Sequence, residues 1–282
     1  MKVIVGYVRI LRPINIIISV ITVLICADIL NELQNTPLLI YTIMTVVLFI
    51  GGANTFNDVH DINTDKINKP YRPIVCGDIS MRSAKIYFII LILAGVGFCL
   101  FLPVQAVLIA LLIAIPVMIL YSIKFKSKPL LGNLLISFLL GLTFLFCGFV
   151  FGNVFPMIIP ASLAFFLTLV RELTKDIEDY VGDNKSGLRT MPIVFGLNRS
   201  IKLVIFLALV TGLLSLIPYF INYYSWYYLI PLTLGVELPL ALVVVSFMFS
   251  PTILTAKKSS VLLKIATIMG IISIHVGATY GC

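Results

Sequence analysis

The stretch NDVHDINTD, residues 57–65, has an acidic pattern that returns as KDIEDYVGD at residues 175–183. Both stretches read Asp-x2-Asp-x3-Asp, and we call them the first and second acidic box: Asp58, Asp61 and Asp65, then Asp176, Asp179 and Asp183. On a continuous helix, the three carboxylates of a box would lie within roughly 60° of one another. Carboxylates that close need a counter-cation, so each box is a candidate metal site.

The residues that follow each box also match. After the first box come Asn68, Lys69, Arg72 and Pro73-Ile74, and after the second come Asn184, Lys185, Arg189 and Pro192-Ile193. One acidic triplet at a helix end is often only solvated charge, but repetition with a matched tail favours a function. A duplicated acidic box followed by basic residues predicts metal ions that hold a phosphorylated ligand.

The composition around the boxes indicates a polytopic membrane protein, because 60% of the residues are hydrophobic and only 11% are charged. We expect an all-α membrane protein with nine transmembrane helices in a bundle. Apolar stretches of spanning length lie near 14–30, 38–56, 84–101, 104–122, 131–151, 155–172, 201–220, 227–249 and 261–278. The sixth stretch could continue into the second acidic box.

The positive charges test this topology independently, since Lys and Arg gather on the cytoplasmic side. All 20 Lys and Arg residues fall in 2–12, 66–85, 124–128, 171–202 and 257–264, at the same end of every second predicted span. We therefore expect a multi-pass cell-membrane protein with the N-terminus and both boxes cytoplasmic and Cys282 outside. The net charge of +8 is then an orientation signal, and we expect no nucleic-acid partner and no obligatory protein partner.

The two boxes follow the second and sixth predicted spans, and an even separation means that the two halves run in the same direction. We expect a parallel internal repeat of helices 1–4 and 5–8, with helix 9 extra. The whole chain, 1–282, would form a single intramembrane domain, with the boxes in cytoplasmic loops at 54–74 and 172–193. Such a repeat would bring both boxes to one central mouth.

This arrangement predicts a diphosphate site, because two acid clusters that each hold a Mg²⁺ ion would neutralise a diphosphate from both sides. The polar and basic residues near the mouth are candidate substrate ligands: Arg12, Asn15, Asn54, Asn57, Lys69, Arg72, Lys124, Lys126, Lys175 and Arg189. For Arg12 and Asn15 an anchor at the membrane interface is an equal alternative. A bundle embedded in lipid suits a long hydrocarbon chain, and the acidic boxes suit a diphosphate. An allylic diphosphate therefore fits the predicted site.

The first motif, N-D-x2-D-x3-D followed by N-K-P-x-R-P-I (57–74), together with the second box, resembles the UbiA-type intramembrane prenyltransferases. The resemblance covers nearly the whole chain. It implies a nine-helix bundle, Mg²⁺-dependent ionisation of a prenyl diphosphate, and attack by an acceptor on the allylic cation. It also implies that Asn57 and the six box aspartates bind the metal and the diphosphate.

The acceptor is suggested by residues 171–179, which are similar to the R-E-x2-K-D-x-E-D form of the archaeal branch of that family. This branch joins geranylgeranyl diphosphate to the free hydroxyl of geranylgeranylglyceryl phosphate, which forms the second ether bond of archaeal-type lipids. Lys124, Lys126 and Lys128 could bind the acceptor phosphate. Residues 186–190 resemble the quinone and chlorophyll branches as much, so an aromatic acceptor such as 4-hydroxybenzoate is the alternative.

A cation transporter is a more remote alternative, since its acids should lie near the bilayer midplane. Only Asp28 and Glu237 are candidate acids within the predicted spans. The general base of the transfer is left open between a diphosphate oxygen, Glu172 and Asp176.

Overall fold

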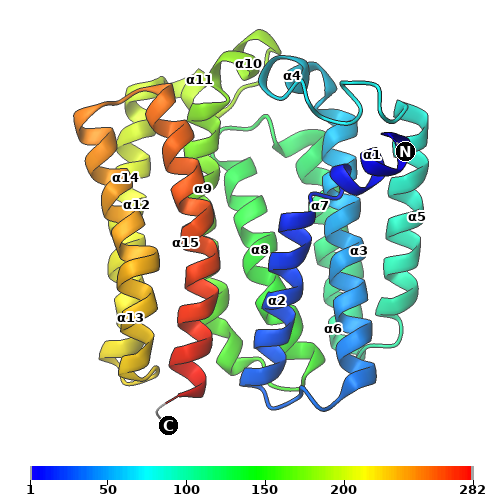
Figure 1. Ribbon diagram of the computed structural model, residues 1–282, viewed down its shortest axis with the longest axis vertical. Helices are drawn as coiled ribbons and strands as arrows, with labels where there is room; N and C mark the ends of the chain where they lie inside the picture. The colour runs from blue at the N-terminus through cyan, green and yellow to red at the C-terminus, as the bar shows by residue number, and fades with distance from the viewer. Residues whose placement is uncertain (1, 281–282) are drawn as a thin grey trace. The chain divides into compact units, whose positions relative to one another are not determined.

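The computed structural model describes residues 2–280, and all regular structure in that range is helical (Figure 1). The chain divides into two compact units. Unit 1 comprises Met1–Phe125 and Thr143–Phe155, and unit 2 comprises Lys126–Leu142 and Pro156–Cys282. The predicted all-α class is confirmed. The single domain over 1–282 and the parallel repeat stay predictions.

Unit 1 is built around the long helix α3, which packs against α2 on one side and α5 on another (Figure 1). Its helices are α1 (Lys2–Ile10), α2 (Pro13–Ile29), α3 (Thr36–His60), α4 (Ile62–Asn68), α5 (Met81–Cys99), α6 (Val104–Ile109), η1 (Ala110–Ala114), α7 (Ile115–Leu120) and η2 (Tyr121–Phe125). The segments η1 and η2 are π-helical, and they lie within one continuous apolar helix from 104 to 125. The C-terminal part of α8 (Leu131–Val150) also belongs to this unit.

Unit 2 contains the N-terminal part of α8 and the rest of the helices, with α14 packed against both α12 and α15. These helices are α9 (Phe155–Glu178), α10 (Tyr180–Lys185), α11 (Met191–Phe195), α12 (Leu197–Phe220), η3 (Trp226–Tyr228), α13 (Leu229–Leu232), η4 (Thr233–Glu237), α14 (Leu238–Phe249) and α15 (Ile253–Thr279). The elements from η3 to α14 form one continuous apolar helix over Trp226–Phe249.

The predicted spans correspond to helices of membrane-crossing length. Within residues 2–280, eight helices are long and apolar enough to cross a bilayer, and a ninth is reached if the bent pair α1 and α2 counts as one span. Helix α9 does continue into the second acidic box, as the sequence suggests. Helix α15 begins at Ile253, before the predicted position 261, because Thr252 caps it by accepting a hydrogen bond from the Thr255 N–H (3.1 Å).

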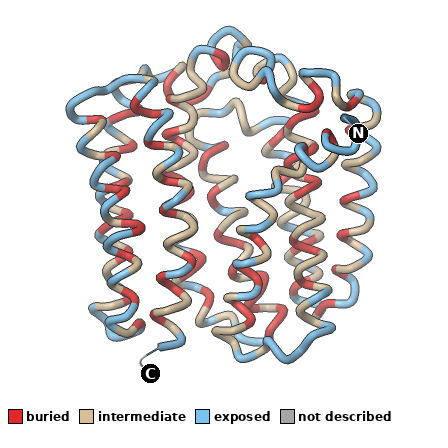
Figure 2. The backbone as a smooth tube through the Cα atoms, in the orientation of Figure 1, coloured by how far each residue is buried: buried red, intermediate tan, exposed pale blue. Residues whose placement is uncertain are grey.

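The exposed surface of the helices is apolar, unlike that of a water-soluble bundle. Buried positions recur along each helix, and exposed positions lie between them (Figure 2). Many exposed positions carry large apolar side chains, among them Leu93, Leu112, Leu213 and Phe249. In a multi-pass membrane protein such side chains face lipid. Buried hydroxyls are satisfied locally, since Thr42 and Thr45 each donate to the carbonyl four residues earlier.

A close contact between α8 and α9 in unit 2 gives a stability prediction. A Cβ added at Gly141 would lie 2.7 Å from the backbone oxygen of Ala161, whereas a Cβ at the exposed Gly97 would meet nothing within 4 Å. We expect Gly141→Ala to destabilise the protein by about 1–3 kcal/mol through overpacking. The control, Gly97→Ala, should be neutral or stabilising. Thermal unfolding midpoints of both variants in detergent test this, and equal midpoints would contradict the contact.

Candidate functional site

The first acidic box crosses a break between two helices. Asp58 lies in the last turns of α3, Asp61 occupies the junction with φ −90° and ψ 4°, and Asp65 lies in the short helix α4. The junction is held by two backbone bonds, from the Asp61 N–H to the Asn57 oxygen and from the Asp65 N–H to the Asp61 oxygen, both 2.8 Å. In Figure 1, α4 turns away from the axis of α3.

The second acidic box repeats this local structure in unit 2. Asp176 lies near the end of α9, Asp179 is at the junction with φ −84° and ψ 2°, and Asp183 lies in α10. The Asp179 N–H bonds the Lys175 oxygen (2.8 Å), and the Asp183 N–H bonds the Asp179 oxygen (3.0 Å). The prediction that each box lies on one face of a continuous helix is therefore wrong. Each box instead bends around a helix end, and the two boxes bend in the same way.

Asp58 is the most strongly engaged residue of the first box. Its side chain is only 2% exposed, and its Oδ1 accepts hydrogen bonds from Arg12 (2.8 Å) and from Arg72. Arg72 also lies 3.9 Å from Oδ2 of Asp65, which is itself buried. The structure thus brings Arg12, Arg72 and two box aspartates together, as the sequence suggests. Removing one partner of such a buried pair typically costs about 3–5 kcal/mol.

The asparagines near the first box hold its surroundings in place. Asn54 is buried and donates from Nδ2 to the backbone oxygen of Leu11 (2.9 Å), which fixes the junction between α1 and α2. The Oδ1 of Asn57 accepts a hydrogen bond from Ser122 in η2. Asn15 lies in the first turn of α2, where its backbone N–H bonds the Arg12 oxygen (2.8 Å).

The second box is surrounded by a different set of polar contacts. Asn133, near the start of α8, donates from Nδ2 to Oδ2 of Asp176 (2.9 Å). Glu172, one turn before the box, accepts from Arg171 (3.0 Å) and from Lys175 (2.9 Å). Glu178 accepts from Ser260 of α15 (2.6 Å), which ties the end of α9 to the last helix.

The remaining predicted ligands are Lys69 and Arg189, which closely follow the two boxes in the chain, and Lys124 and Lys126, which are distant from both boxes in the sequence. The backbone N–H of Lys69 bonds the Asp65 oxygen (2.8 Å), so Lys69 directly follows α4. Lys124 is exposed and lies 5.8 Å from the ring centre of Phe125. Lys126 is half-buried at the beginning of unit 2. Arg189 is exposed in the segment between α10 and α11.

Sequence reasoning missed three polar residues that support the boxes: Ser122, Asn133 and Ser260. Each is a polar side chain in or beside an apolar helix, a position where polar residues are rare and usually have a partner. That signal was available for Asn133, because the stretch 131–151 contains almost no other group able to bond a carboxylate. The partner itself could not be read from the sequence, since Asn133 and Asp176 lie on different helices.

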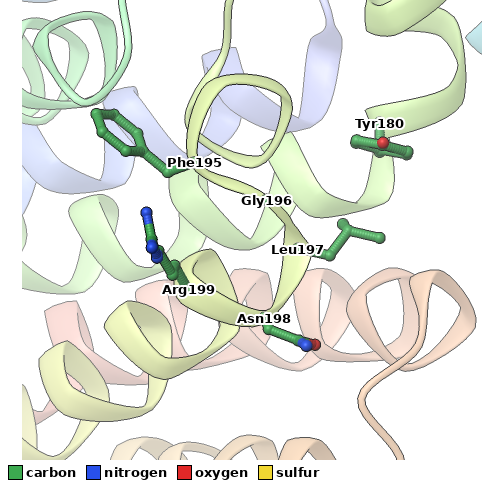
Figure 3. A pocket seen from close by; sticks show the side chains of 6 residues that line it. All are labelled: Tyr180, Phe195, Gly196, Leu197, Asn198 and Arg199. Carbon is green, nitrogen blue, oxygen red and sulfur yellow. The ribbon is translucent and has the colours of Figure 1, made fainter.

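A pocket of about 620 Å³ lies next to the second box in unit 2. It is lined by Tyr180, Phe195, Gly196, Leu197, Asn198 and Arg199, which come from α10, α11 and the start of α12 (Figure 3). Arg199 supplies a guanidinium group and Asn198 an amide at one side of the pocket. The pocket therefore combines one positive charge with apolar walls.

The atoms of the first box fit a hard divalent cation. Oδ2 of Asp58 is buried and has no hydrogen-bond partner, although an isolated carboxylate oxygen is costly to bury. Across residues 2–280, no three His, Cys, Asp or Glu side chains form a closed metal-binding group. Mg²⁺ usually binds one or two carboxylates and takes its other ligands from phosphates and water, so the buried Asp58 carboxylate is a suitable ligand for it.

Asn133 gives a test of the second box. Asn133→Ala removes the hydrogen bond that orients the Asp176 carboxylate, and loss of such a supporting contact typically costs about 10–100-fold in metal affinity or activity. We expect catalytic activity to fall by about tenfold, with the unfolding midpoint little changed. Asn153→Ala, in the exposed loop between α8 and α9, is the matched control. Full activity of the Asn133 variant would exclude the positioning role.

Comparison with known proteins places the chain in a family. The UbiA prenyltransferase family matches residues 18–270. A digeranylgeranylglyceryl phosphate synthase from Methanosphaera stadtmanae is 36% identical over 224 residues, which covers 79% of this chain and 81% of that protein. A solved structure concerned with digeranylgeranylglyceryl phosphate synthase in membranes is 30% identical, with a TM-score of 0.76 and 99% of both chains covered.

A more distant solved structure shares the fold. The UbiA homologue from Archaeoglobus fulgidus bound to DMAPP and Mg²⁺ is 19% identical, with a TM-score of 0.61, and the match covers 96% of this chain and 99% of that one. The family match spans most of the chain and includes both acidic boxes. The protein is therefore a member of the UbiA prenyltransferase family.

Proposed function

We propose that this protein transfers a geranylgeranyl group from geranylgeranyl diphosphate to geranylgeranylglyceryl phosphate, forming the second ether bond of archaeal-type membrane lipids. The observation that carries the reaction type is the pair of acidic boxes that bend alike around two helix ends. The choice of acceptor is supported by relatives named digeranylgeranylglyceryl phosphate synthase that are similar over most of their length.

The two boxes act on one diphosphate in this proposal, each through one Mg²⁺ ion. The buried Oδ2 of Asp58 supports a ligand role in the first box, and the six box aspartates are the proposed ligands. When bound, Mg²⁺ neutralises the diphosphate and makes it a better leaving group. Homologues of the family have been solved with DMAPP or GPP and Mg²⁺, which supports the choice of ion.

The basic residues of the first box bind the diphosphate directly. Arg12 and Arg72 share the Asp58 carboxylate in the structure, and we expect them to move to phosphate oxygens when substrate binds, because guanidinium groups suit phosphate geometry. The C1–O bond of the prenyl diphosphate then breaks, and its electron pair leaves with the diphosphate. The acceptor hydroxyl oxygen forms the new bond to C1 and gives up its proton to a base, for which a diphosphate oxygen, Glu172 and Asp176 are the candidates. Lys124, Lys126 and Lys128 are the proposed ligands of the acceptor phosphate.

The protein is a multi-pass membrane protein, and the proposal adds an orientation. The N-terminus and both boxes lie on the cytoplasmic side, because every Lys and Arg falls in segments at that end of the predicted spans. The C-terminal residue Cys282, expected outside, lies beyond the described residues.

A product assay tests the acceptor. Purified protein receives radiolabelled geranylgeranyl diphosphate and Mg²⁺, with geranylgeranylglyceryl phosphate and 4-hydroxybenzoate offered in parallel. We expect label in a doubly prenylated glyceryl phosphate. Label on the aromatic acid instead would replace the lipid acceptor by the quinone-type one, and transfer to neither would overturn the proposed acceptor while leaving family membership intact.

A further inference from the structure

Helix α1 has two faces of different character. Its inner face packs on the segment between α4 and α5: a Cβ at Gly6 would lie 2.9 Å from the Ile79 side chain, and Ile10 is fully buried. Ile10 belongs to a cluster with Val59, Ile74, Ile79 and Ala84. An ion pair between Arg9 and Asp78 (2.9 Å) stabilises the same contact. The inner face is thus fixed to unit 1.

The outer face of α1 is apolar and exposed. Ile4, Val5 and Val8 lie on one side of the helix and are 70%, 47% and 51% exposed. Three neighbouring large apolar side chains on one short helix form a patch that water does not favour, and such patches mark contact surfaces. In unit 1 nothing covers this face among the described residues.

The continuation into α2 indicates what covers the patch. Helix α2 carries an exposed stripe of Ile14, Ile17, Ile21 and Leu24, at a spacing that follows one side of the helix. Helix α2 forms a candidate membrane span together with α1, and an exposed apolar stripe on a membrane-spanning helix faces lipid. The outer face of α1 directly precedes this stripe in the chain, which favours lipid as its neighbour.

Charge and geometry disfavour the acyl core as the position of α1. The helix and its junction carry Lys2, Arg9 and Arg12, and each such charge costs about 2.5–3.5 kcal/mol at the centre of a membrane helix. The chain bends by 46° between α1 and α2, where Arg12 takes a left-handed conformation with φ 58°. A short basic helix with one apolar face is typical of segments that lie in the membrane interface.

We propose that α1 is a membrane-surface helix whose outer face, Ile4, Val5 and Val8, lies in the border between lipid headgroups and acyl chains. The inner face of α1 packs on the segment 71–84 and keeps this segment at the depth of the membrane interface. The left-handed turn at its end then directs Arg12 to Asp58. The bilayer surface thereby becomes part of what positions the first acidic box, which suits an enzyme whose substrates carry a phosphate on a hydrocarbon chain.

Tryptophan fluorescence tests this placement without using activity. The chain has one tryptophan, so Trp226→Phe gives a background without tryptophan, into which Ile4→Trp is introduced. The protein is reconstituted in phosphatidylcholine bilayers brominated either near the carbonyl end or near the methyl end of the acyl chains, and aqueous iodide is added separately. Tyr7→Trp, on the half-buried inner face beside Tyr87, is the matched control on the same helix.

We expect the indole of the Ile4→Trp variant to be quenched most by bromine near the carbonyl end and weakly by iodide, and that of the Tyr7→Trp variant to be quenched less by either. Strongest quenching of the Ile4→Trp variant by bromine near the methyl end would overturn the proposal, because α1 would then be the first part of a broken span. Strong iodide quenching without lipid quenching would also overturn it, because the outer face would then lie in water.

Discussion

Replacing Asp58 or Asp179 by asparagine is expected to lower prenyl transfer by more than about a hundredfold, because both are proposed metal ligands and the loss of a ligand exceeds the loss of a group that only supports one. Asparagine keeps the shape of the side chain and one oxygen. In Asp58→Asn this oxygen can still accept a bond from Arg12 or Arg72, which share Oδ1 in the structure. What is lost is the negative charge that would hold the metal ion, and with that ion the neutralisation of the diphosphate.

The measurement is initial-rate turnover of each variant, with size-exclusion profiles and unfolding midpoints measured in parallel. Glu32→Gln is the matched control, since it removes the same charge in the loop between α2 and α3, where the Glu32 carboxylate accepts a hydrogen bond from Asn35 (3.2 Å). We expect the control to keep full activity. Activity retained in both box variants would remove the metal–diphosphate role from the acidic boxes.

Chelation of divalent metal has an effect of similar size. We expect EDTA to reduce transfer to background and added Mg²⁺ to restore it, because the reaction needs Mg²⁺ to neutralise the leaving diphosphate. EDTA already saturated with Mg²⁺ serves as the control and leaves the rate unchanged. Transfer that persists after exhaustive chelation would mean that Arg and Lys side chains alone stabilise the leaving group.

The membrane architecture could be predicted from the sequence because its physical signals are strong. Apolar stretches of spanning length and the gathering of Lys and Arg located the helices, and the structure has helices at all the predicted positions. The helix boundaries could be predicted less accurately, because they depend on local capping residues. Thr252 starts α15 earlier than hydropathy alone indicates, since a capping hydroxyl has no hydropathy signal.

The residues of the site were predicted better than their geometry. Spacing identified both boxes, but it assumed a continuous helix, and the breaks at Asp61 and Asp179 carry neither proline nor glycine that would mark them. The contact of Arg12 with Asp58 depends on a left-handed residue between two helices, a conformation that an arginine rarely adopts. The role of Asn133 depends on packing between helices far apart in the chain.

The most direct test of the proposal that both boxes act on one diphosphate is a binding titration with a thiolodiphosphate analogue of geranylgeranyl diphosphate, which resists ionisation. Affinity is measured with and without Mg²⁺ for the wild type, Asp58→Asn, Asp179→Asn and the double variant. If both boxes hold one diphosphate, each single variant loses most of the Mg²⁺-dependent affinity, and the double variant loses little more. Binding by either single variant as tight as that of the wild type would contradict the account, because one box would then be sufficient.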